Sequence, residues 1–170
     1  DYVWELTELQ TLVLADNGLS SISPRLGRLT RLRMLDLGHN ALAELPDTIG
    51  ELAELRDFLY LHDNQLLALP ASLGRLTGLR YLNLSENKLA ELPAAVFELT
   101  GLVELRVSDN SLSRLPEAIG QLSELRELHL RNNHLTTLPA SVGQLRNLRQ
   151  LDLRGNPLTE LPAELAELPM

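Results

Sequence analysis

The sequence has no cysteine among its 170 residues. It therefore has neither a disulfide framework nor a thiolate nucleophile, and this absence favours a cytoplasmic location, either in the producing cell or in a host cell after delivery. Long hydrophobic runs are also missing, and no stretch is apolar enough for a transmembrane helix or for the core of a signal peptide. We therefore expect no association with a membrane.

Basic residues are fewer than acidic ones. The chain has 15 Lys and Arg residues against 23 Asp and Glu residues, which gives a net charge of −8. Phosphate backbones repel a chain of this charge unless its basic residues gather in a patch, and here they alternate with acidic residues along the sequence. We therefore expect no nucleic-acid partner.

Motifs for catalysis or for cofactor binding are lacking too. The four histidines stand in neither an HxH nor an HExxH pattern, which argues against a metal site. There is no glycine-rich phosphate loop, and nothing in the sequence would activate the hydroxyl group of Ser85 or Ser108. The sequence predicts a protein that is not an enzyme and that needs no cofactor.

An internal repeat dominates what the sequence does contain. Units of 23 residues tile residues 9–170, except that the third unit, residues 55–78, has 24. Residues 1–8 resemble the end of a preceding unit, so the sequence predicts a single domain over residues 1–170. The seven units begin at Leu9, Leu32, Leu55, Leu79, Leu102, Leu125 and Leu148.

Each unit has two halves with different periodicity. In the first half apolar residues such as Leu128 alternate with polar ones such as Glu127 and His129, which predicts a strand with one buried face. In the second half a proline precedes apolar residues at three-residue spacing, which indicates a short helical or 3-10 segment. An asparagine separates the halves, and we expect its amide to be buried and to bond the backbone of the turn. These asparagines are Asn17, Asn40, Asn64, Asn87, Asn110, Asn133 and Asn156.

The repeated motif LxxLxLxxNxLxxLPxxIGxL, found over essentially the whole chain, resembles that of leucine-rich repeat proteins. The 23-residue unit is similar to the intracellular type of bacterial effector proteins and of Ras-group repeat proteins in plants and animals. The resemblance implies a right-handed α/β solenoid, a horseshoe with a concave parallel β-sheet and short helical or 3-10 returns on its convex side. It also implies a protein partner bound on the concave face, with the chain forming part of a larger bacterial protein.

The third unit carries one surplus residue, which lies between Leu55 and Leu59. A register slip would turn Leu59 and Leu61 outward and bury Tyr60, so we predict instead a β-bulge near Arg56 and Asp57 that leaves the core positions unchanged. The sequence leaves open whether the surplus is natural length variation or a deliberate insertion.

Aromatic residues are scarce, with one Trp, three Tyr and two Phe in the chain. Phe58, Tyr60 and Tyr81 are all expected at outward strand positions of neighbouring units. Exposed apolar patches mark partner sites, although cross-strand aromatic pairs can also serve only to stabilise a sheet. The predicted partner-binding residues are Met34, Asp36, His39, Phe58, Tyr60, His62, Tyr81, Asn83, Glu104, Arg106 and His129.

A second interpretation concerns assembly. Neither end of the sequence shows a recognisable polar cap over its terminal leucines, and solenoids normally have such caps. The alternative to partner recognition is therefore a structural or engineered scaffold. In that scaffold the uncapped ends or the insertion near Asp57 would drive formation of a homodimer.

Overall fold

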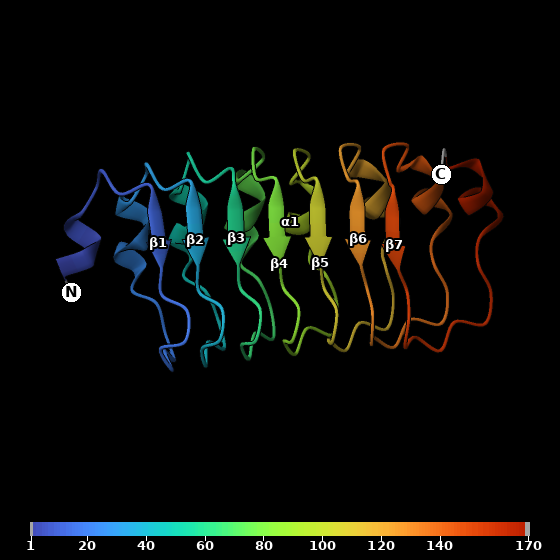
Figure 1. Ribbon diagram of the computed structural model, residues 1–170, viewed down its shortest axis with the longest axis horizontal. Coiled ribbons are helices and arrows are strands. Elements are labelled where there is room, and N and C mark those ends of the chain that lie inside the picture. The colour runs from blue at the N-terminus through green and yellow to red at the C-terminus, as the bar shows by residue number, and fades with distance from the viewer. Residues whose placement is uncertain (1, 169–170) are drawn as a thin grey trace.

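The computed structural model describes residues 2–168 and consists of a coil with one short strand in each turn (Figure 1). The seven strands form a single sheet in which each strand pairs in parallel with the next along the chain. The predicted parallel sheet is therefore confirmed. The strands are β1 (Thr11–Val13), β2 (Met34–Asp36), β3 (Phe58–Tyr60), β4 (Tyr81–Asn83), β5 (Glu104–Arg106), β6 (Glu127–His129) and β7 (Gln150–Asp152).

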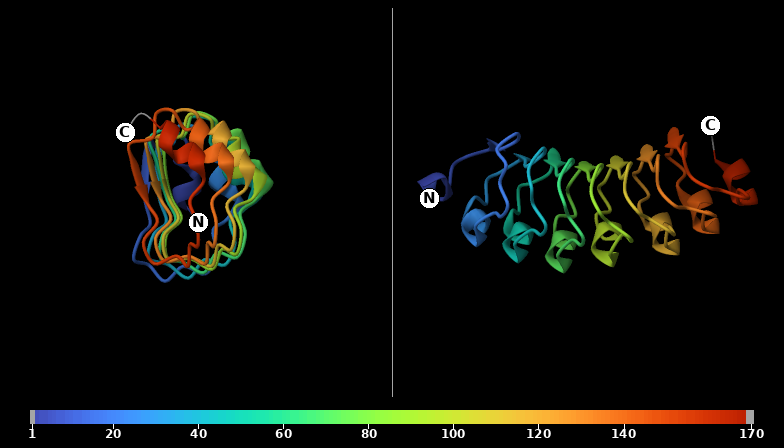
Figure 2. Two further views of the ribbon diagram at one scale, coloured as in Figure 1. Left: turned by 90° about the vertical axis from the view of Figure 1, so that its right-hand side faces the viewer. Right: turned by 90° about the horizontal axis from the view of Figure 1, so that it is seen from below.

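Short helical segments return the chain from the end of one strand to the start of the next. All but the first two have a proline at the N-cap, where its fixed φ suits the start of a helical turn. Strands line the inner side of a shallow curve and the returns line the outer side (Figure 2). The 3-10 segments are η1 (Tyr2–Glu5), η2 (Pro24–Arg28), η3 (Asp47–Glu51), η4 (Ala71–Arg75), η5 (Glu117–Gln121), η6 (Ala140–Gln144) and η7 (Ala163–Glu167), and the one α-helix is α1 (Ala94–Phe97).

None of the helices within residues 2–168 combines the length and the apolar character needed to cross a bilayer. Met170, at which the predicted last unit ends, lies outside the described residues, and so do Asp1 and Pro169.

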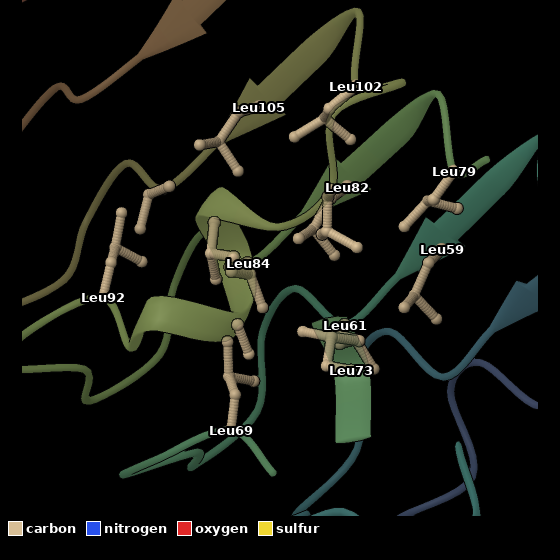
Figure 3. Close-up of a cluster of buried hydrophobic side chains, with 14 of the residues drawn as sticks. Leu59, Leu61, Leu69, Leu73, Leu79, Leu82, Leu84, Leu92, Leu102 and Leu105 are labelled. Carbon is tan, nitrogen blue, oxygen red and sulfur yellow. The ribbon is translucent and has the colours of Figure 1, made fainter. Parts of the chain in front are cut away.

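Leucines from the strands and from the returns fill the interior of the coil. Leu59, Leu82 and Leu105 follow one another on neighbouring strands, point inward together (Figure 3) and are fully buried. Fully burying a leucine side chain contributes about 1.5–3 kcal/mol to the stability of the fold. The alternation of buried and outward residues along each strand thus fixes which side chains reach the concave surface.

From the second unit on, each asparagine bonds backbone groups of its own unit and of the unit before it. Asn110 donates hydrogen bonds from Nδ2 to the carbonyl oxygens of Leu84 and Val107, at 2.9 and 3.3 Å, and its Oδ1 accepts from the Leu89 N–H group at 3.0 Å. Our expectation of burial is wrong at Asn17, which is exposed and bonds only carbonyl groups of its own unit. Within residues 2–168 no earlier asparagine turn lies beside Asn17 to supply partners.

The residue before each of these asparagines adopts a left-handed backbone conformation, which the sequence did not lead us to expect. Its φ lies between 50° and 57° in the first six units, and the seventh unit uses Gly155 with a φ of 72°. Asn and Asp visit this region more readily than most residues, and glycine does so without steric cost. The six non-glycine residues are Asp16, His39, Asp63, Glu86, Asp109 and Asn132.

The third unit absorbs its surplus residue without a slip in register. Leu59 pairs with Leu82 and Tyr60 with Asn83, and Leu59 is fully buried. The hydrogen bond just before β4 does change. In the next units the N–H group at this position donates to the carbonyl oxygen of the residue directly before the preceding strand, as Val103 does to Arg80. The Arg80 N–H group donates instead to the carbonyl oxygen of Arg56, and Asp57, directly before β3, is skipped. The β-bulge at Arg56 and Asp57 stays a prediction, and the register agrees with it.

The fourth unit departs from its neighbours on the convex side. At the position of Gly50 a side chain would collide with Ser72 of the next return, and Phe97 occupies the equivalent place in α1. The Phe97 ring is buried, and η5 packs less closely on α1 than η6 packs on η5. The bulky ring therefore separates two returns that glycine would allow to touch.

Candidate functional site

Three aromatic rings gather on the concave face, from β3 and from β4. The Phe58 and Tyr60 rings stack with centroids 5.8 Å apart, and the Tyr81 ring lies 5.5 Å from Phe58 and 5.0 Å from Tyr60. We call these three residues the aromatic cluster. Met34 pairs in register with Phe58 on the neighbouring strand and is half-buried. Phe58 keeps 41% of its surface exposed, so the cluster presents apolar area to solvent.

Both tyrosines of the cluster sit in surroundings that disfavour a negative charge. Partial burial raises the pKa of the Tyr60 and Tyr81 phenols above the usual value. The negative charges of Asp36 and Glu104 raise the pKa of Tyr60 further. The rings therefore stay neutral at any physiological pH and offer a partly apolar surface.

Two histidines extend the cluster toward the ends of the strands. The His39 and His62 rings meet edge to face with centroids 4.7 Å apart, and the His62 ring lies 6.0 Å from that of Tyr60. The His62 ring lies against Gly38, and a Cβ added to Gly38 would come within 2.5 Å of the ring, so a larger residue there would displace it. The Nδ1 atom of His62 is buried and has no hydrogen-bond partner among residues 2–168.

The carboxylate of Asp63 is hydrogen-bonded to His39. His39 Nδ1 lies 2.6 Å from Asp63 Oδ2, and this hydrogen bond raises the pKa of His39 above its ordinary value. Both residues precede the asparagine of their unit, so the turns of two neighbouring units place them side by side.

A polar group from β5 and β6 lies beyond the aromatic cluster. The buried His129 places Nε2 3.3 Å from Glu127 Oε2 and 3.8 Å from Glu104 Oε1, and the sequence analysis did not foresee this grouping. One imidazole and two carboxylates are ligand types that zinc accepts. Arg106, however, donates a hydrogen bond to Glu104 Oε1 at 2.5 Å and neutralises that carboxylate. We therefore interpret the group as an ion-pair network.

Two of the predicted binding residues have a structural role. Asp36 accepts a hydrogen bond from the Gly38 N–H group at 2.9 Å, and Asn83 accepts one from the Ser85 N–H group at 3.1 Å. Asp152 occupies the same position in the last unit and bonds Arg154, which holds the pKa of the carboxyl at about 2. These side chains shape the turn after the strand whether or not a partner binds.

The structure thus brings the predicted residues into two neighbouring groups. One joins Met34 and the aromatic cluster with the histidines His39 and His62, and the other joins Glu104, Arg106 and His129. The sequence analysis missed a third feature, a hollow of about 230 Å³ beside the cluster. The sequence feature that could have indicated this hollow is Val103, because several other units have the much longer arginine at the equivalent position. The hollow is lined by Asp57, Phe58, Arg80, Tyr81, Val103 and Glu104.

Comparisons with known proteins agree on the family. Models described as "Leucine rich repeat", "Leucine-rich repeat region" and "Leucine Rich repeats (2 copies)" match residues 7–66, 49–129 and 123–167 respectively. A search of the curated proteins found no significant match to the chain.

Solved structures of similar fold come from bacteria and from plants. A leucine-rich repeat protein of Leptospira interrogans is 32% identical with a TM-score of 0.78, and the match covers 98% of this chain and 48% of that one. The ectodomain of an Arabidopsis thaliana receptor kinase, GASSHO1/SCHENGEN3, in complex with Casparian strip integrity factor 2, is 35% identical with a TM-score of 0.85, and the match covers 96% and 20%.

A third structure is the plant peptide hormone receptor RGFR1 in complex with RGF2. It is 34% identical with a TM-score of 0.87, and the match covers 98% of this chain and 28% of the receptor. The chain therefore spans less than half the length of each of these three structures. Family models that together match residues 7–167, and a shared solenoid architecture, show that the chain belongs to the leucine-rich repeat proteins.

Proposed function

We propose that this chain is a non-enzymatic protein-recognition module that binds a protein partner on its concave face. The observation that carries the proposal is the aromatic cluster, in which three rings stand together on the outer face of a sheet and Phe58 remains 41% exposed. A solvated face gains little from such rings, whereas aromatic residues are enriched among the residues that dominate binding energy in interfaces.

The family supports the same proposal. Leucine-rich repeat domains commonly bind proteins, and two of the similar structures are receptors in complex with named factors. Because the chain spans only part of these structures, its place within a larger bacterial protein is a further part of the proposal. A cytoplasmic location, expected from the absence of cysteine, stays a prediction.

The competing explanation is that the rings only stabilise the sheet. Cross-strand aromatic pairs contribute about 0.2–1 kcal/mol each, so this explanation predicts lower stability and unchanged binding when the rings are removed. The proposal predicts the loss of a bound partner in a protein that stays folded. The two explanations therefore differ in a binding measurement.

Affinity capture with a double variant makes this test. Tyr60→Ser with Tyr81→Ser should recover much less of the protein partner than the original chain, with unchanged far-UV circular dichroism. The control is Leu67→Ser, which removes a large apolar side chain that is 66% exposed and lies outside the strands of the sheet. Equal recovery by the double variant and by the control would refute recognition through the cluster.

A structural or engineered scaffold is the second candidate function. In it the insertion near Asp57 or the ends of the coil drive self-association. Leu6 and Leu161, toward the two ends of the described residues, are 55% and 58% exposed, and such apolar surface favours association. Sedimentation velocity at several concentrations tests this candidate, because a sedimentation coefficient that stays at the value of a monomer at every concentration would exclude it.

A further inference from the structure

Two hollows lie next to each other where the middle strands of the sheet begin. The first is the hollow beside the aromatic cluster, which we call the aromatic hollow. The second, of about 580 Å³, we call the arginine hollow. They share Arg80 and Val103, so together they form one continuous surface. The arginine hollow is lined by Ala53, Arg56, Thr77, Gly78, Arg80, Gly101, Val103, Glu124 and Arg126.

The arginine hollow carries an excess of positive charge in a chain of net charge −8. Three arginines line it, Arg56, Arg80 and Arg126, against a single carboxylate, that of Glu124. Arg56 pairs with Glu54, but within residues 2–168 neither the Arg80 nor the Arg126 guanidinium makes an ion pair. Two guanidinium groups are therefore available to an anionic ligand group.

Small residues leave room for such a group between the arginines. A Cβ built on Gly78 would meet nothing closer than Arg56 Cβ at 3.9 Å. Gly101 in the next unit lines the same hollow, but a Cβ there would come within 2.7 Å of the Thr77 carbonyl oxygen, so the open space lies at Gly78. A ligand group can thus approach the backbone at this edge of the sheet.

The aromatic hollow is suited to an apolar group instead. Phe58, Tyr81 and Val103 supply its apolar surface. Its two carboxylates already have partners, because Asp57 pairs with Arg33 at 3.2 Å and Glu104 pairs with Arg106 at 2.5 Å. Several other units have an arginine directly after their first leucine, where the fifth unit has Val103. The apolar side chain of Val103 lines both hollows and therefore connects the aromatic hollow to the arginine hollow.

We infer that the two hollows together bind a segment of a protein partner in which a large apolar side chain stands next to an aspartate or a glutamate. The apolar side chain fills the aromatic hollow, and the carboxylate accepts hydrogen bonds from Arg80 and Arg126, an arrangement that suits the planar guanidinium group. Long polyanions do not fit, since the chain as a whole repels them. The inference rests on the proposed function, because it names the chemistry of the partner.

Selection of linear peptides displayed on phage tests the inference without a known partner. Peptides are selected on the original chain, and those that lose binding to Tyr60→Ser with Tyr81→Ser are kept as ligands of the concave face. We expect these peptides to be enriched in an apolar residue adjacent to Asp or Glu. If no selected peptide depends on the tyrosines, the proposed function fails and the inference fails with it.

Affinities of a selected peptide then isolate the arginine hollow. Arg80→Gln should weaken binding about tenfold, the usual effect of losing one charge-assisted hydrogen bond. Changing the acidic residue of the peptide to its amide should weaken binding by a similar factor, and the two changes together should add little beyond either one.

Gly78 offers a matched pair of further variants. Gly78→Glu places a carboxylate among the arginines and should abolish binding of the acidic peptide, whereas Gly78→Ala occupies little space and should leave the affinity within about twofold. Peptides that need the tyrosines but carry no acidic residue, and whose affinity is the same for Gly78→Glu and Gly78→Ala, would overturn the inference and leave the proposed function standing.

Discussion

At the scale of single residues, the asparagines tie neighbouring turns of the coil together. Each buried amide bonds backbone groups of its own unit and of the preceding unit, so it links the two turns. The first asparagine is the exception, since Asn17 bonds only within its own unit through Nδ2 and is exposed. The buried Asn110 and the exposed Asn17 stand at equivalent positions of their units, so a substitution of Asn17 can serve as the control for the same substitution of Asn110.

We predict that Asn110→Ala destabilises the protein by about 1–3 kcal/mol, because it leaves the buried Leu89 N–H group without a partner, whereas the Leu84 carbonyl oxygen keeps its hydrogen bond from Asn87 Nδ2. Asn17→Ala should cost less than about 1 kcal/mol, since water replaces its contacts. Urea unfolding of both variants measures the difference. Equal losses of stability would contradict the role assigned to the buried amide.

The pair of His39 and Asp63 predicts a pH dependence. Because the hydrogen bond to Asp63 raises the pKa of His39, the fold favours the protonated ring, and the stabilisation is present below pH 6.5 and lost as the pH rises through the raised pKa. Titration of the His39 ring signals by NMR should show a lower pKa in Asp63→Asn. Glu86→Gln should lower it less, since Glu86 acts only through its more distant charge. A larger change in Glu86→Gln than in Asp63→Asn would contradict this assignment.

At the scale of elements, the sequence was sufficient to predict the strands, the returns and the register. Leucines that alternate with polar residues give only one face that can be buried, and the surplus residue before Leu59 could not change that choice without exposing leucines. The aromatic cluster followed from the same alternation. The inward and outward positions of the strands were therefore predictable, because the polarity of each residue decides whether its side chain is buried.

Features that depend on contacts between units were not predictable in this way. The left-handed residue before each asparagine is a different residue type in several units, so no single sequence signal marks it. Phe97 breaks a row of small residues, but only the packing of α1 on η5 shows that its ring is buried. The hollows likewise depend on several units, because three units line the aromatic hollow and five line the arginine hollow.

Deletion of Asp57 tests the bulge in the third unit. It restores the regular spacing, and the Arg33 ion pair that it removes is between partly exposed groups and therefore contributes little. We expect the melting temperature to rise by about 2–4 °C, the effect of about 1 kcal/mol in a chain of this size. Asp57→Ala removes the ion pair but keeps the length, so it should leave the melting temperature nearly unchanged. A lower melting temperature of the deletion variant would show that the fold needs the extra residue.

At the scale of the whole molecule, the repeat makes the concave face a rigid surface. Each turn of the coil packs on its neighbours, and the sheet fixes the orientation of successive outward side chains. A partner that binds such a surface loses little free energy to ordering of the protein. The third to fifth units, which depart from the regular motif at Asp57, Phe97 and Val103, also carry the aromatic cluster, the aromatic hollow and most of the lining of the arginine hollow.

Recognition on the concave face is the central claim, and site-specific photocrosslinking tests it most directly. A benzoylphenylalanine placed at Tyr60 should crosslink to the protein partner that the chain captures, and the same group placed at Gln144, exposed on the convex return η6, should not. Crosslinks from Gln144 with none from Tyr60 would contradict the account, because the partner would then be bound on the opposite face.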